Sequence, residues 1–166
     1  FANEKKPVYK IYIDADYSHH SESSISIEQG FKVAMAQAGN QLMRRKVVFV
    51  RKDHRGNSTG SKKHIKQYLK DPEALLLSSG IHSPPLLAHM KFINDNQVLY
   101  LDPWAAAGPI TRCNKSKEAW IFRLSVDDRK AGKFISTYAV KNKKYKKPFL
   151  MLENTGWGKS NHKTMS

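Results

Sequence analysis

Short apolar runs alternate with longer amphipathic stretches over the first hundred residues of the chain. The apolar runs are rich in β-branched and aromatic residues, as expected of buried strands, and lie at 8–14, 46–50, 74–78 and 98–101. Between them, apolar side chains recur at the helical spacing of three or four residues. This alternation predicts an α/β fold with a Rossmann-like parallel sheet and helices on both of its faces.

The helical stripes have recognisable beginnings and ends. The stripe after the first strand consists of Ile27, Phe31, Ala34, Met35 and Ala38. Ser23 or Ser24 is available as its N-cap and Gly39 as its C-cap. The next stripe carries Ile65, Tyr68 and Leu69, and a third helix is expected to begin near Pro84 or Pro85, because proline suits the first turn of a helix.

The regular alternation of strands and helices ends after the fourth strand. A long connection at 102–119 leads to an expected strand at 120–124 and an amphipathic helix that begins after it. A further strand is predicted at 148–152, and the stretch from 153 onward begins another helix. This order predicts a first lobe at 1–124 and the beginning of a second, incomplete lobe at 125–166, so that the chain is expected to be the first part of a longer protein.

The charge of the chain is strongly basic, at +15. A polyanion partner or a solvated basic surface would both explain it. The lysines are dispersed over helix faces, and the one dense run, at 141–148, contains a single aromatic residue, Tyr145. We therefore expect a solvated surface and no nucleic-acid partner, with a basic nucleic-acid-binding α/β domain as the weaker alternative.

Few features of the sequence bear on compartment. No apolar stretch approaches the roughly 20 residues of a transmembrane helix. The single cysteine, Cys113, can form neither an internal disulfide nor a CxxC pair. The first residues, "FANEKKP", fit the end of a signal peptide and predict export to a periplasmic or extracellular location.

The motifs that carry chemistry are weak. "GNSTGSKK" at 56–63 fails the phosphate-loop spacing, because its glycines enclose three residues and a serine precedes the lysine, so a turn and an N-cap are expected. Asp14, Asp16 and Asp53 follow strands and are interpreted as loop acids and helix caps, with a metal site as a minor alternative. His19 and His20 are adjacent, but two neighbouring side chains seldom chelate an ion without a third ligand. We predict no catalytic residue, no metal and no cofactor.

Polar loops follow each of the predicted strands. In parallel sheets, ligands bind beyond the carboxyl ends of the strands. The loop "DPWAAAG" differs from the others, because it sets a tryptophan beside three alanines where a polar turn would be ordinary. Small side chains there predict a surface that another molecule approaches closely.

Taken in order, these segments resemble the type I periplasmic binding proteins of the leucine/isoleucine/valine-binding family, which serve ABC transporters. The resemblance rests on "IEQGFKVAMAQAG", "VVFVRKDHRGNS", "LLLSSGIHSPPLLA", "LYLDPWAAAGPIT", "WIFRLSVDDRKAG" and "ENTGWGKSN", and covers nearly the whole chain. It implies a non-enzymatic protein that captures a small polar ligand, an amino acid or a related organic molecule, between two lobes and delivers it to a membrane permease. A ligand-sensing ectodomain of a signalling protein is the alternative.

The resemblance also implies the site. The implied ligand-binding residues are Ser83, Trp104, Ala105, Ala106, Trp157 and Tyr17. Ser83 matches the serine that binds a ligand carboxylate, and Trp157 the aromatic residue that covers the ligand from the second lobe. Ala106 stands where amino-acid binders have threonine, and Trp104 replaces a small residue, which favours a flatter, aromatic or cationic ligand.

Overall fold

The computed structural model describes residues 7–112 and 119–166. The suggested signal-peptide remnant, apart from Pro7, and Cys113 lie outside the described residues. Within the described residues, six strands form one sheet in the order β2-β3-β1-β4-β5-β6, and every pair is parallel except β2 with β3. The strands are β1 (Tyr9–Ala15), β2 (Gln41–Leu42), β3 (Arg45–Asp53), β4 (Ala74–Ser79), β5 (Tyr100–Asp102) and β6 (Ile121–Arg123).

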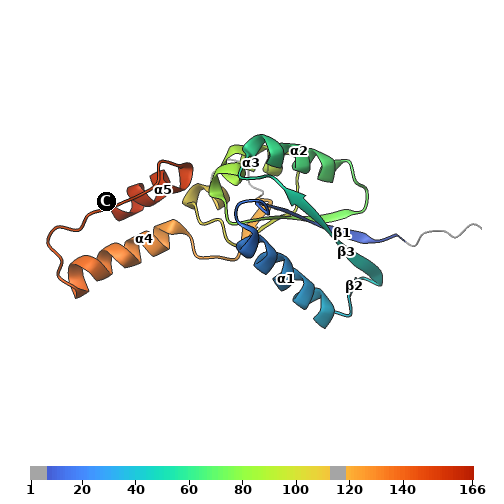
Figure 1. Ribbon diagram of the computed structural model, residues 1–166, viewed down its shortest axis with the longest axis horizontal. Coiled ribbons are helices and arrows are strands. Elements are labelled where there is room, and N and C mark those ends of the chain that lie inside the picture. Colours follow the sequence, from blue (N-terminus) through green and yellow to red (C-terminus); the bar gives the residue numbers. More distant parts are fainter. Residues whose placement is uncertain (1–6, 113–118) are drawn as a thin grey trace, which may run out of the picture.

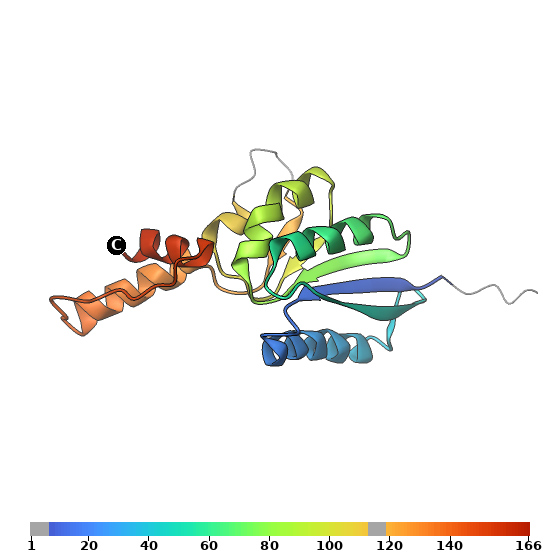
Figure 2. The same cartoon turned by 45° about the horizontal axis from the view of Figure 1, so that its top comes forward.

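Helices cover both faces of this sheet. Figure 2 shows α1 (Ser21–Gln37) on one face and α2 (Ser58–Leu69) with α3 (Ser83–Asp95) on the other. Side chains of the central strand β1 alternate between the two faces. Ile11 and Ile13 belong to the core under α1, whereas Tyr12 packs in the core that includes Ile65 of α2. The α/β architecture predicted from the apolar runs is therefore confirmed.

Three expectations about α1 are wrong in detail. The helix begins one turn earlier than expected, after His20, and Ser24 lies inside it, where its hydroxyl donates to the carbonyl of Asp16 at 2.9 Å. Ala34 and Ala38 are exposed, because only the residues nearest the sheet reach the core. The end of the helix differs from the expectation by one residue: Ala38 is the C-cap, and Gly39 follows it with a φ of 69°, a conformation that glycine adopts without strain.

The turn that precedes α2 has the expected form. Asn57 is the N-cap of α2, and its side-chain oxygen accepts hydrogen bonds from the amides of Thr59 and Gly60 at 2.7 and 3.3 Å. Gly56 provides the left-handed residue of the turn, with a φ of 68°. The segment is thus a turn and a helix cap.

Beyond β6 the chain leaves the sheet. A 3₁₀ turn, η1 (Gly108–Thr111), precedes β6, and α4 (Asp128–Thr137) follows it and runs into a π-helical turn, η2 (Tyr138–Asn142). The chain returns to α5 (Gly156–Met165), which lies beside α4 beyond the carboxyl ends of the strands (Figure 1). No helix among the described residues has the length and apolar character needed to cross a bilayer.

The strand expected at 148–152 does not form. This segment is irregular and mostly exposed, with Phe149 and Met151 both 89% exposed. A strand needs a neighbouring backbone to receive its hydrogen bonds, and no described strand lies beside this segment. The apolar side chains of α4, Phe134 and Ile135 among them, are likewise exposed.

Candidate ligand-binding site

A pocket lies between the carboxyl edge of the sheet and the helical pair α4 and α5. Its volume is about 640 Å³. The wall on the sheet side is made by the loops after β1, β3, β4 and β5, and the opposite wall by the first turn of α4, the first turn of α5 and the segment just before α5. Parallel strands all end at this edge, which is why loops distant in sequence meet here.

Four of the six expected site residues line this one pocket. They are Ser83, Trp104, Ala106 and Trp157. The other two lie elsewhere. The side chain of Ala105 is fully buried in the core under α2 and α3, and the hydroxyl of Tyr17 donates to Glu28 Oε2 at 3.0 Å on the α1 side of the sheet.

Asp102 holds the loop that carries Trp104. Its Oδ1 accepts hydrogen bonds from Ser79 Oγ at 3.0 Å and from the amides of Trp104 and Ala105 at 3.3 and 2.8 Å. Burial raises the pKa of Asp102 to about 6, although these donors and Arg123 oppose the rise. With its backbone fixed in this way, Trp104 projects into the pocket wall with half of its surface, 51%, exposed.

Ser83 occupies the first position of α3, immediately after the N-cap residue His82. It is buried, and its Oγ accepts a hydrogen bond from the amide of Ala107 at 3.3 Å, so its hydroxyl proton remains available for a ligand. Pro84 and Pro85 follow and have no N–H group. The N-terminus of α3 therefore offers fewer backbone donors to an anion than an ordinary helix does.

The opposite wall carries a buried carboxylate with one unsatisfied oxygen. Asp128 opens α4, and its Oδ1 accepts a hydrogen bond from the indole Nε1 of Trp157 at 3.2 Å. Asp128 Oδ2 is buried and has no hydrogen-bond partner among the described residues. Burial raises the pKa of this carboxyl group above its ordinary value, although the nearby side chains of Trp157, Asn161 and Ser160 oppose the rise. A ligand that donates a hydrogen bond to Asp128 Oδ2 would remove the cost of burying it unpaired.

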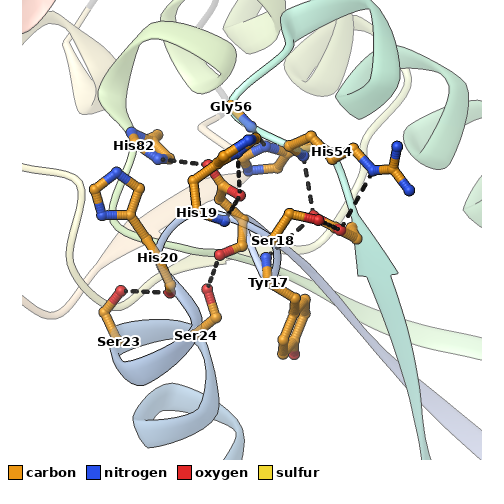
Figure 3. Close-up of polar contacts among 12 residues, drawn as sticks. Tyr17, Ser18, His19, His20, Ser23, Ser24, His54, Gly56 and His82 are labelled. Carbon is orange, nitrogen blue, oxygen red and sulfur yellow. Dashed lines mark hydrogen bonds and ion pairs between the residues drawn. The ribbon is translucent and has the colours of Figure 1, made fainter.

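Three further side chains that are separated in sequence meet beside the sheet-side wall, and two of them, His20 and His82, line the pocket. Asp16, His20 and His82 come from the loops after β1 and β4, and their potential ligand atoms all lie within 4.8 Å of one another. Figure 3 shows the rings of His20 and His82 side by side at the start of α1. A signal for this cluster existed, because the first and third parallel strands, here β1 and β4, are neighbours in one common type of doubly wound sheet, which brings the loops that follow them together.

The remaining acids at this edge are occupied within the protein. Asp14 receives a hydrogen bond from Ser61, and His64 Nδ1 lies 2.7 Å from its other oxygen, so it joins β1 to α2. Asp53 accepts from the amide of Tyr17 at 3.1 Å and from Ser18 Oγ at 2.6 Å. Neither belongs to the cluster around Asp16.

Structural comparison places the fold among solute-binding proteins of known structure. A periplasmic binding protein from Burkholderia mallei superposes with a TM-score of 0.85 at 18% identity, over 97% of this chain and 43% of that one. An ABC transporter solute-binding protein from Rhodopseudomonas palustris, solved with 3,4-dihydroxybenzoic acid, gives 0.83 at 16% identity, over 96% and 43%. A leucine-binding protein from Thermotoga maritima gives 0.71 at 19%, over 82% and 38%.

The chain thus spans less than half the length of each of these proteins. No curated protein matches the sequence. The family described as "Periplasmic binding protein" matches residues 13–166, which include every residue of the pocket. The chain therefore belongs to the periplasmic binding protein family.

Proposed function

We propose that this chain supplies the first lobe, residues 1–124, and the start of the second, residues 125–166, of an exported solute-binding protein that takes up a small aromatic acid bearing a hydroxyl group. The protein delivers its ligand to an ABC transporter permease and carries out no reaction of its own. The observation that carries the proposal is the pocket itself, in which an exposed tryptophan on each wall accompanies a buried, unpaired carboxylate oxygen.

The two tryptophans of the pocket favour a flat ligand. Trp104 and Trp157 stand on opposite walls, and both keep a third or more of their surface exposed. Flat rings stack on indoles with about 0.5–1.5 kcal/mol beyond the gain from burial, whereas a branched aliphatic side chain gains the burial alone. The pocket therefore favours an aromatic ring over leucine, although the resemblance is to branched-chain amino-acid binders.

The polar side chains on the two walls favour particular polar groups on the ligand. The sheet-side wall carries His20, His82 and the Ser83 hydroxyl, all capable of binding a carboxylate. The opposite wall carries Asp128, whose Oδ2 accepts no hydrogen bond from the part of the chain that the structure describes. An acid with a hydroxyl group at its far end meets both requirements, and the Rhodopseudomonas palustris protein of similar fold was solved with a molecule of this kind.

The ligand is captured by closure of the two lobes, because each lobe supplies one wall of the pocket. A ligand that touches both walls stabilises their approach, because its contacts with the second wall exist only when the lobes are closed. Closure of this type is the state that we expect the permease to recognise.

Isothermal titration calorimetry with four compounds tests the proposal. We expect 4-hydroxybenzoate to bind more tightly than benzoate by roughly tenfold to a hundredfold, the value of one hydrogen bond to a charged group. Cyclohexanecarboxylate and leucine are expected to bind more weakly than benzoate, because neither stacks on the indoles.

The variant Asp128→Asn separates the two parts of the proposal. Loss of the negative charge is expected to reduce the difference in affinity between 4-hydroxybenzoate and benzoate and to leave the affinity for benzoate nearly unchanged. Asp95→Asn, at an exposed acid at the far end of α3, serves as the matched control. Equal affinity of the unaltered protein for all four compounds, or tightest binding of leucine, would overturn the proposed ligand class.

A further inference from the structure

The cluster of Asp16, His20 and His82 has the composition of a transition-metal site. Asp16 follows β1, His20 directly precedes α1, and His82 directly precedes α3. Each residue thus stands where a strand gives way to a helix. One carboxylate and two imidazoles form a donor set that Zn²⁺ and similar ions prefer.

The Asp16 carboxylate is oriented by its neighbours. The amide of His19 donates to Asp16 Oδ1 at 2.9 Å, and His19 Nδ1 lies 3.2 Å from the same oxygen. Burial would raise the pKa of Asp16, but the contacts with His19 and His82 outweigh it and lower the pKa, so the group is a carboxylate at neutral pH. Its second oxygen, Oδ2, faces His82 Nε2 at 3.3 Å.

Space is kept open at this second oxygen. A Cβ atom at Gly56 would lie 3.3 Å from Asp16 Oδ2, and the φ of 68° at Gly56 disfavours any side chain there. A position held by glycine beside a carboxylate leaves room for another group to approach Oδ2.

The two candidate imidazole ligands stand together. The rings of His20 and His82 meet edge to face, with centroids 4.6 Å apart (Figure 3). His54 lies behind His82 at 5.9 Å and takes a different role. The amide of Gly56 donates to His54 Nδ1 at 3.0 Å, so the ring proton of neutral His54 is on Nε2, and burial lowers its pKa and keeps it neutral. His54 supports the site and is not a ligand.

We propose that Asp16, His20 and His82 bind one divalent transition-metal ion, of which Zn²⁺ is the type, and that the ion takes the carboxylate of the captured acid at its open position. Three protein ligands leave one tetrahedral position free. His20 and His82 belong to the cluster and also line the pocket, so the free coordination position of the ion faces the ligand. The inference rests on the proposed function for the identity of the ligand, but the metal site does not.

A metal ion would also compensate for the small number of free backbone donors on the sheet-side wall. Pro84 and Pro85 remove two backbone donors from the first turn of α3. The amides of Trp104 and Ala105 already donate to Asp102, and the amide of Ala107 already donates to Ser83. A bound cation supplies the positive charge that these donors would have given. Ligands of tetrahedral Zn²⁺ stand about 3.3 Å apart, and exposed His20 can close the remaining gap by a change of rotamer.

The test uses tag-free protein titrated with Zn²⁺ in a calorimeter and with Co²⁺ followed by its visible absorption, which reports tetrahedral coordination. We expect one ion per chain. His20→Gln and His82→Gln each remove a direct ligand and are expected to weaken binding by roughly a hundredfold, at least the loss typical of outer-shell changes. His162→Gln, at an exposed histidine of α5, is the matched control and is expected to change nothing.

A second pair of titrations, with 4-hydroxybenzoate in EDTA and in Zn²⁺, separates this inference from the proposed function. We expect at least tenfold weaker acid binding in EDTA for the unaltered protein and no difference between the two buffers for His20→Gln. Because His20 is exposed, this variant is expected to fold even where a change at buried Asp16 would not. Failure of the folded protein to bind Zn²⁺, or equal metal affinity in both histidine variants and the unaltered protein, would overturn the metal site.

The two claims fail differently. Tight acid binding that EDTA does not affect would overturn the role of the ion in capture while supporting the proposed function. Zn²⁺ binding that depends on His20 and His82, without binding of any aromatic acid, would support the metal site and overturn the ligand class.

Discussion

The indole nitrogen of Trp157 donates a hydrogen bond to Asp128 Oδ1 across 3.2 Å and so joins the first turn of α5 to the first turn of α4. The bond fixes the indole in the pocket wall. It also occupies one carboxylate oxygen and leaves the other, Oδ2, as the unpaired acceptor beside the pocket. One hydrogen bond therefore sets both the aromatic and the polar character of this wall.

Trp157→Phe tests that relationship. Phenylalanine keeps a ring in the wall but cannot donate to Asp128, so we expect 4-hydroxybenzoate affinity to fall several-fold, and Trp157→Ala to lower it further because the ring is lost as well. Calorimetric titration measures both. Trp120→Phe, at a tryptophan that does not line the pocket, is the control. Equal losses in Trp157→Phe and Trp157→Ala would show that the hydrogen bond alone matters.

Trp104→Ala is expected to weaken ligand binding and to leave the melting temperature nearly unchanged. The side chain is 51% exposed, so its removal opens no cavity, whereas truncation of a core tryptophan costs roughly 3–5 kcal/mol of stability. Indole fluorescence with added 4-hydroxybenzoate and a thermal melt supply the two measurements. A large drop in melting temperature with unchanged affinity would assign Trp104 to the fold.

Ser83→Ala is expected to affect both affinity and stability. Removal of the hydroxyl leaves the buried amide of Ala107 without its acceptor, at a cost of about 1–3 kcal/mol in the free energy of unfolding, and removes a ligand donor worth roughly tenfold in affinity. Urea unfolding and calorimetry measure the two effects. Ser26→Ala, at an exposed serine of α1, is the control. Unchanged affinity would exclude Ser83 from the ligand contacts.

Asp102 is expected to make stability depend on pH. Burial raises its pKa from 3.8 to about 6 in the folded protein. A raised pKa means that the folded state binds the proton more tightly, so this contribution is present below about pH 4 and is lost as pH rises through about 6. The full loss amounts to about 3 kcal/mol in the free energy of unfolding.

Urea unfolding of the protein and of Asp102→Asn between pH 4 and pH 7 measures this loss. The variant cannot ionise here, so we expect it to gain stability relative to the unaltered protein as pH rises. If the variant instead loses stability relative to the unaltered protein as pH rises, the ion pair between Asp102 and Arg123, at 3.9 Å, outweighs the effect of burial.

The sheet and its covering helices were predictable because their signals are local. The run at 8–14 and the helical stripe with Ile27 each carry a period that points to one structure. The segment at 148–152 has the composition of a strand but pairs with none of the described strands, and composition cannot report the presence of a partner. The first turn of α1 was misplaced because either of two serines could cap it and neither does.

The candidate site was predictable only in part. Ser83, Trp104, Ala106 and Trp157 came from the resemblance to a family, and the structure brings all four to one pocket. Asp16 and His82 are far apart in sequence and become neighbours through the order of β1 and β4 in the sheet. Spacing along the chain carries no trace of that order, and only the strand order common in doubly wound sheets could have pointed to a third ligand beside His20.

The fixed loop after β5 has a consequence for how new specificities arise in this protein. Because Asp102 and Ser83 hold the amides of Trp104, Ala105 and Ala107, the backbone there cannot shift to accept a larger or smaller ligand. Exchange of the side chain at 104 or 106, however, disturbs none of these bonds. Single substitutions at those two positions therefore offer an evolutionary path to other substrates that does not pass through unstable intermediates.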